Sequence, residues 1–157
     1  FGTSLALGCG GRSYLGPLHF CSPYAVTQKN CLARLKEFET REDYTEITHG
    51  ILLSEEEQKR RYVIRHLLIL PGIDTGRYEE LYHRGIFEDF PVLKEWETSG
   101  YLALQKAKPR TWLHLTEEGL GLSDYLGPQL ISDEVRHAME EWEKENGCEP
   151  PNNHLQR

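Results

Sequence analysis

Apolar residues recur at helical spacing along most of the chain. In residues 27–38, Cys31, Leu32, Leu35 and Phe38 fall on one face, which predicts an amphipathic helix of about three turns. The same periodicity predicts further helices over residues 54–70, 75–83, 87–98 and 131–142. The chain is therefore expected to be mainly helical.

Local signals mark where two of these helices begin. Ser54 precedes three glutamates, and with Glu57 three residues later it forms a capping box ahead of an acidic first turn. Pro71 and the following glycine stop this helix, because proline cannot continue the hydrogen-bonding pattern. Asp74 is placed to cap the next helix.

Strand-like runs are few and short. Residues 5–7 predict a strand that leads into a glycine-rich segment. Residues 101–104 and 111–115 are strand-like runs on either side of a polar tip, so these two runs pair best as a hairpin. Three helices followed by a two-stranded hairpin is the order of a winged helix. We therefore predict an α+β, mainly helical fold with a winged-helix-like domain over residues 51–145, a preceding segment over 1–50 and a flexible tail over 146–157.

Composition is typical of a folded globular protein. The chain has 157 residues, 38% of them hydrophobic, with three tryptophans and eight tyrosines. No apolar run approaches the roughly 18 residues of a membrane span, and no secretory signal is visible. These features predict a cytoplasmic protein that does not associate with membranes.

Charge is distributed unevenly. Residues 1–36 contain four basic and no acidic residues, a charge of +4, and the remaining 14 basic and 25 acidic residues give −11, for a net charge of −7. The basic segment either faces an anionic ligand or acidic partner, or reflects chance in a short window. The helix over 87–98 carries four acids and one lysine, so it would repel phosphates, and no nucleic-acid partner is predicted.

The four cysteines do not indicate a metal site. Cys9, Cys21 and Cys31 are separated by eleven and nine intervening residues, and Cys148 is remote in sequence, which matches neither zinc ligand spacing nor a C-x-x-C redox pair. We expect reduced thiols and no bound metal.

The glycine-rich segment is the strongest candidate for a binding element. Gly8, Gly10 and Gly11 permit backbone angles that other residues avoid and a close approach to a ligand or to a neighbouring strand. A tight turn without a ligand is the alternative. Because no second strand, helix or nucleotide motif precedes it and the chain opens with Phe1, we expect a piece of a larger enzyme.

Three segments, taken in order, resemble a known family. Residues 8–15 read GCGGRSYL, similar to a G-x-G-A-x-S-Y-L element with Gly11 in place of alanine. The second segment consists of residues 53–57 (LSEEE) with 60–65 (RRYVIR), and the third of residues 93–102 with 115–119 (LTEEG). This ordered set, over roughly residues 5–140, resembles the carboxy-terminal part of the oxygen-independent coproporphyrinogen III oxidase family of radical S-adenosylmethionine (SAM) proteins.

The resemblance implies an incomplete β/α barrel that holds SAM and a [4Fe-4S] cluster, followed by a helical, winged-helix-like domain. In the family, reductive cleavage of SAM gives a 5′-deoxyadenosyl radical, which in the best-known members leads to oxidative decarboxylation of porphyrinogen propionates; relatives include heme chaperones. Residues 1–50 would then be the last strand, glycine-rich loop and helix of the barrel. The cluster-binding C-x-x-x-C-x-x-C is absent from this sequence, so no catalytic residue is expected here, and SAM and the cluster are implied only for the full-length protein.

Site roles also follow from the resemblance. Gly8, Gly10 and Gly11 would lie near SAM, and Arg12, Tyr14 and Arg61 would face an anionic tetrapyrrole substrate, since guanidinium groups bind carboxylates in a bidentate manner. For Arg61 the alternative is an ion pair with the glutamate four residues earlier, and for Tyr14 it is packing.

The expected function is therefore that of an accessory domain. It would close over its own radical SAM barrel and shape the substrate cleft without catalysing alone. The alternative is a stand-alone winged-helix module for protein interaction, without redox activity. An exposed strand near residues 3–8 also predicts a homodimer through that edge.

Overall fold

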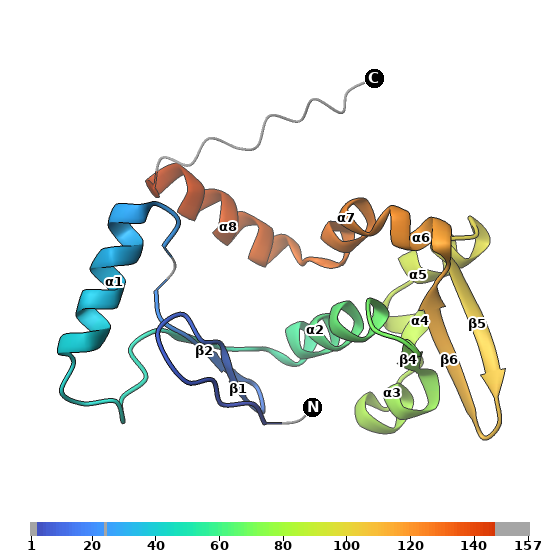
Figure 1. Cartoon of the computed structure of the whole chain (residues 1–157). Helices are drawn as coiled ribbons and strands as arrows, with labels where there is room; N and C mark the ends of the chain where they lie inside the picture. The colour runs from blue at the N-terminus through green and yellow to red at the C-terminus, as the bar shows by residue number, and fades with distance from the viewer. Residues whose placement is uncertain (1–2, 24, 147–157) are drawn as a thin grey trace. The chain divides into compact units, whose positions relative to one another are not determined.

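The computed structural model describes residues 3–23 and 25–146 (Figure 1). It is an α+β structure with two small antiparallel sheets, as the sequence predicted at this level. The chain divides into two compact units, Phe1–Gln58 (unit 1) and Lys59–Arg157 (unit 2), and each is described by itself.

Unit 1 combines a small sheet with one helix. Its elements are β1 (Ser13–Leu15), β2 (Leu18–Phe20), α1 (Gln28–Thr40) and β3 (Gly50–Leu52), with sheet order β1-β2-β3. The β1–β2 hairpin turns at Gly16, whose φ of 56° lies in the left-handed region that glycine adopts without strain. Thr27 caps α1, because its side chain accepts a hydrogen bond from the Asn30 N–H.

The strand predicted over residues 5–7 is wrong. In this part of the chain only Ser4 pairs, as an isolated bridge with Tyr14, and the residues that follow form a loop. The glycines turn the chain here. Gly8 and Gly10 have φ values of 92° and 79°, and the Gly11 N–H donates a hydrogen bond to the Gly8 carbonyl, which closes a turn. The hairpin of β1 and β2 carries the unit's sheet instead.

Helix α1 forms where the sequence predicted it, but its inward face keeps only Cys31 and Phe38 of the predicted apolar face. The half-buried positions are Cys31, Arg34, Phe38 and, at the C-cap, Arg41. Leu32 and Leu35 are exposed, by 58% and 46%, and no residue of α1 is fully buried.

The connection after α1 explains this orientation. It folds back against the inward face, because the Tyr44 hydroxyl donates a hydrogen bond to the Phe38 carbonyl and the Arg41 guanidinium donates one to the Glu46 carbonyl.

Unit 2 contains most of the secondary structure. Its elements are α2 (Glu55–Leu67, whose first turn belongs to unit 1), β4 (Ile73–Asp74), α3 (Thr75–Tyr82), α4 (Ile86–Asp89), α5 (Val92–Thr98), β5 (Leu102–Ala107), β6 (Arg110–Leu115), α6 (Glu117–Gly121), α7 (Ser123–Leu126), the 3₁₀ helix η1 (Gly127–Leu130) and α8 (Asp133–Asn146). The sheet order is β4-β6-β5.

Several predicted features of this part of the chain are confirmed. The Ser54 hydroxyl accepts from the Glu57 N–H, the Asp74 carboxylate accepts from the Arg77 N–H, and β5 and β6 pair as a hairpin. The helix predicted over 87–98 is instead two helices, α4 and α5, because Pro91 has no N–H to continue the ladder. Helix α2 ends at residue 67, three residues earlier than predicted.

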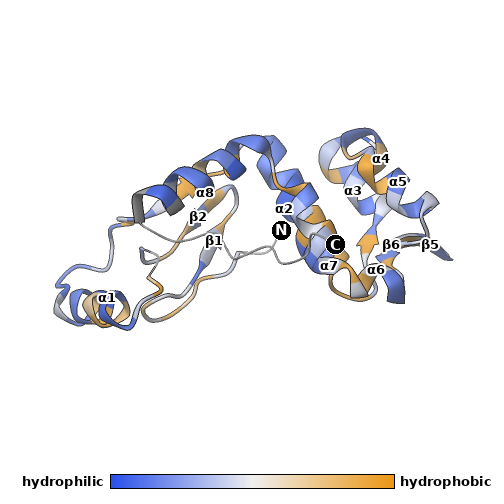
Figure 2. Ribbon diagram, turned by 90° about the horizontal axis from the view of Figure 1, so that it is seen from above, coloured by the Kyte–Doolittle hydropathy of each residue, from blue (hydrophilic) through white to orange (hydrophobic). Residues whose placement is uncertain are grey.

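The hydrophobic core of the described residues lies entirely in unit 2. It consists of fourteen side chains: Tyr62, Val63, Leu67, Ile73, Tyr78, Ile86, Phe90, Leu93, Trp96, Leu102, Leu113, Leu115, Leu126 and Leu130. Of the three tryptophans, Trp96 is buried, whereas Trp112 is half-buried and Trp142 is 37% exposed. Figure 2 shows hydrophobic residues interspersed along α8, which is otherwise hydrophilic. Beyond residue 146 the predicted tail lies outside the described residues.

Candidate functional site

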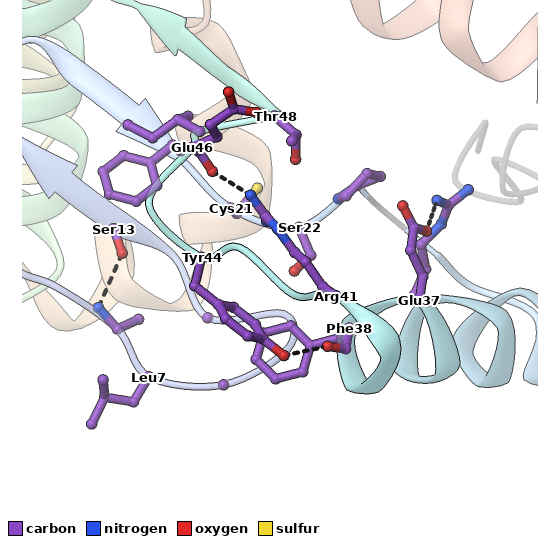
Figure 3. Close-up of a pocket in the computed structure, with 17 residues that line it drawn as sticks. Leu7, Ser13, Cys21, Ser22, Glu37, Phe38, Arg41, Tyr44, Glu46 and Thr48 are labelled. Atoms are coloured by element: carbon purple, nitrogen blue, oxygen red, sulfur yellow. Dashed lines mark hydrogen bonds and ion pairs between the residues drawn. The ribbon is translucent and has the colours of Figure 1, made fainter.

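An open pocket of about 420 Å³ lies within unit 1 (Figure 3). Three segments that are distant in sequence enclose it: the glycine-rich loop, the strands β1 and β2 with the residues after them, and α1 with the connection to β3. Its lining comprises Ala6, Leu7, Gly8, Gly11, Ser13, Phe20, Cys21, Ser22, Pro23, Arg34, Glu37, Phe38, Arg41, Tyr44, Glu46, Ile47 and Thr48. The pocket therefore combines charged, hydroxyl and aromatic groups.

The glycine-rich loop forms one wall through hydrogen bonds and close backbone contacts. The Gly10 N–H donates to the Ser22 hydroxyl oxygen at 3.3 Å, and the Ala6 N–H donates to the buried Ser13 hydroxyl oxygen at 3.0 Å. A Cβ atom on Gly11 would lie 2.7 Å from the Cβ of Ala6, closer than real side chains approach. An alanine at position 11 would therefore not fit this loop.

The opposite wall consists of α1 and the chain that follows it. Figure 3 shows Arg41 bonded to the Glu46 backbone carbonyl and the Tyr44 hydroxyl bonded to the Phe38 carbonyl. The guanidinium carbon of Arg41 lies 5.6 Å from the Tyr44 ring centroid, and the Tyr44 and Phe38 rings meet edge to face at 5.2 Å. Arg34, by contrast, pairs with Glu37.

The connection after α1 also holds an ionised carboxylate close to the pocket. Hydrogen bonds from the Thr45 hydroxyl and then from the Thr45 N–H lower the pKa of Asp43, and the charge of Arg41 adds to this effect. These bonds form a local turn, so Asp43 fixes the backbone that carries Tyr44.

The residues predicted from the sequence are only partly brought together. Gly8 and Gly11 line the pocket, and Gly10 bonds to Ser22 beside it. Arg12 is exposed and lies outside the lining. Tyr14 also lies outside it and packs against His19.

The alternation of side chains along the strands explains the place of Tyr14. In the β1–β2 register Ser13 is opposite Phe20, and Tyr14 is opposite His19. Since neighbouring residues of a strand point to opposite faces, Ser13 and Phe20 reach the pocket while Tyr14 points away from it. Its ring stacks on His19 with a centroid distance of 4.5 Å.

Arg61 belongs to unit 2, where it is half-buried in α2. The pocket of unit 1 is therefore built without it.

Sequence reasoning missed the principal polar residues of the pocket. Arg34 and Arg41 are seven residues apart, which is two helical turns, and Phe38 lies between them on the same face. That spacing is visible in the sequence, but the apolar pattern of Leu32 and Leu35 favoured the other face.

Unit 2 contains a second cluster of ionisable groups. The Asp89 carboxylate, 6% exposed, accepts the Tyr78 hydroxyl at 2.8 Å and lies 3.2 Å from the Lys59 ammonium and 3.1 Å from the Arg84 guanidinium. Burial, the largest single effect, raises the pKa of Asp89, but the hydrogen bonds and cationic neighbours together outweigh it and hold the pKa below its ordinary value. Burial followed by the bond to Asp89 raises the pKa of Tyr78. This cluster joins α2, α3 and α4.

The described residues do not offer a ligand set for a metal or an iron–sulfur cluster. Cys9, Cys21 and Cys31 are free thiols, and the described part of the chain contains no group of three or more His, Cys, Asp or Glu side chains placed to hold an ion. A [4Fe-4S] cluster therefore does not fit these residues.

Among the described helices, none is both long enough and apolar enough to cross a membrane.

Comparison with known proteins adds no relationship. The chain matches no protein-family model, and no significant similarity to a curated protein or to a solved structure was found.

Proposed function

We propose that this chain is a non-catalytic part of a radical SAM protein of the coproporphyrinogen oxidase-like group. In this proposal unit 1 completes the edge of a β/α barrel, and unit 2 is a winged-helix-like domain that closes over the substrate cleft. The observation that carries the proposal is the contrast in apolar burial between the two units.

Unit 2 has a hydrophobic core of its own, whereas unit 1 does not. Among the described residues of unit 1 only Ser13 is buried, and ten large apolar side chains are exposed. A chain of this size must bury much apolar surface to offset the entropy lost on folding. Unit 1 is therefore expected to gain stability by covering its apolar residues with further protein, and Leu32 and Leu35 on the outward face of α1 are among the side chains exposed for that contact.

The glycine-rich loop supports the assignment of that further protein as a radical SAM barrel. The resemblance of residues 8–15 to the family element implies that the loop would lie beside SAM, and in the structure Gly8 and Gly11 border a pocket. When bound, SAM and its cluster would supply the radical chemistry. The residues of this chain would shape the pocket wall, and the cluster ligands would come from other residues of the protein.

Two experiments test the proposal. The coding region upstream of the Phe1 codon should encode C-x-x-x-C-x-x-C, and an open reading frame that begins near residue 1 would refute the proposal. In hydrogen–deuterium exchange, amides of residues 28–52 should exchange fast in the isolated chain and slowly in the full-length protein, while the core segments of unit 2 serve as the control and exchange alike in both. Equal protection of residues 28–52 in both proteins would also contradict it.

An open groove favours the alternative, a winged-helix interaction module. This groove of about 750 Å³ lies between α3, the start of α4 and the β5–β6 hairpin. Its arginines are balanced by acids, since Arg77 pairs with Glu80 at 2.9 Å and Arg110 lies 3.5 Å from Asp74. The reading-frame experiment separates the two functions, because the module needs no barrel.

A further inference from the structure

We infer that the pocket of unit 1 is a binding site for a small carboxylate that carries an aromatic or apolar body, with Arg41 as its anchor. The inference rests on the chemistry of the pocket wall and is independent of the proposed function.

The first step is the electrostatic state of Arg41. Its guanidinium is held by a neutral backbone carbonyl and by the face of the Tyr44 ring. Among the described residues, no carboxylate forms an ion pair with Arg41, and its charge acts on the Asp43 carboxylate only without direct contact. A half-buried guanidinium that is oriented but has no ion-pair partner keeps N–H groups available for a bidentate bond to a carboxylate.

The second step is the contrast with Arg34. Arg34 lines the same pocket two helical turns earlier, but it forms an ion pair with Glu37. Of the two arginines in the pocket lining, Arg41 is therefore the one whose guanidinium is not already in an ion pair. A ligand with one anionic group is favoured over a ligand with two.

The third step is the apolar surface beside Arg41. The Phe38 and Tyr44 rings meet edge to face there (Figure 3). Leu7, Phe20 and Ile47 add aliphatic and aromatic side chains to the pocket lining. A volume of about 420 Å³ is in the range of small-molecule sites. A free phosphate would leave this apolar surface in water, whereas a carboxylate with an aromatic body would cover it.

The test measures binding of phenylacetate to the complete chain by ¹H–¹⁵N NMR titration, with phenylacetamide as its uncharged counterpart. We expect shifts confined to backbone amides of the glycine-rich loop, residues 20–22 and residues 34–48, and affinity for the amide at least tenfold weaker. Arg41→Gln should weaken phenylacetate binding by about tenfold or more, because it removes a charge-assisted bidentate bond. Arg12→Gln is the matched control, with the same change of charge in the same unit, and should change the affinity by less than about threefold, since Arg12 is exposed and lies outside the pocket lining.

Each outcome bears on the inference. Equal binding of the acid and the amide, the absence of binding, or equal losses from Arg12→Gln and Arg41→Gln would overturn it. If Arg41→Gln disturbs the spectrum of unit 1, the comparison of acid with amide on the unchanged chain still decides. Failure here leaves the proposed function untouched, because that is decided by the upstream coding sequence and by exchange protection.

Discussion

The buried carboxylate of Asp89 should be the most sensitive polar position of unit 2. We consider Asp89→Asn, which keeps the size of the side chain and removes its charge. The amide would still accept the Tyr78 hydroxyl, but the Lys59 ammonium, only 13% exposed, would face an uncharged group. Removing one member of a buried ion pair typically costs about 3–5 kcal/mol, and this is the loss expected in the free energy of unfolding.

The neighbours of Asp89 give a graded series that tests the same reasoning. Tyr78→Phe removes one hydrogen bond to a charged acceptor inside the core and should cost about 1.5–3 kcal/mol. Arg84→Gln is the matched control: Arg84 lies 3.1 Å from Asp89 but is 55% exposed, so solvent screens the pair and the loss should stay below about 1 kcal/mol. The order of the losses in unfolding free energy therefore follows how deeply the partner of Asp89 is buried, and not its distance from the carboxylate.

Urea unfolding followed by tryptophan fluorescence provides the measurement. All three tryptophans belong to unit 2, so the signal reports that unit alone. The expected order of destabilisation at pH 7 is Asp89→Asn, then Tyr78→Phe, then Arg84→Gln. If all three variants differed from the unchanged protein by less than about 0.5 kcal/mol, the cluster would not stabilise the fold as argued.

The pH dependence supplies an independent check. Because the pKa of Asp89 is lower in the folded state, its ionised form stabilises the fold fully above the unfolded-state pKa near 3.8, and this stabilisation declines as pH falls below that value. The difference in unfolding free energy between the unchanged protein and Asp89→Asn should therefore be constant from pH 7 to about 5 and then decrease toward pH 3. A difference that does not change with pH would show that Asp89 is not the titrating group.

Two packing predictions concern the hairpin side of unit 2. A Cβ on Gly119 would lie 2.1 Å from the Tyr101 carbonyl oxygen, so Gly119→Ala should destabilise the unit by about 1–3 kcal/mol in the same urea assay, whereas Gly121→Ala, with open space around it, should stay within about 0.5 kcal/mol. Leu113 is fully buried, so Leu113→Ala should lower the free energy of unfolding by about 2–5 kcal/mol. The same substitution at its cross-strand neighbour Leu104, which is 39% exposed, should cost about 1 kcal/mol or less. Equal losses would mean that Leu113 is not central to the core.

Much of unit 2 could be predicted because its local signals agree with its packing. Ser54 and Asp74 are placed as caps by sequence and act as caps in the structure. The hairpin forms because its two apolar runs flank a polar tip. The strand β4, two residues long, could not be predicted, since its only reason to be extended is its pairing with β6.

Unit 1 was predicted less well because its local pattern conflicts with its tertiary contacts. The apolar run at residues 5–7 suggested a strand, but two glycines with positive φ turn the chain before a ladder can form. The sequence singled out the glycine-rich loop as a candidate binding element, and in the structure Gly8 and Gly11 border a pocket, whereas the opposite wall of that pocket depends on how residues 41–48 return to α1. That return is set by side-chain to backbone bonds from Arg41 and Tyr44, which no periodicity encodes.

The orientation of α1 connects the two proposals physically. A helix in an isolated small domain gains most by turning its leucines inward, yet α1 turns Arg34, Phe38 and Arg41 inward and leaves Leu32 and Leu35 in water. Such a conflict between local pattern and packing is expected where a surface serves binding rather than stability. Arg41, the inward arginine without an ion pair, is then available to bind an anion, and the outward leucines are available to an apolar neighbour. Because these two surfaces lie on opposite faces of one helix, a ligand can bind the first without the second, and each can be tested separately.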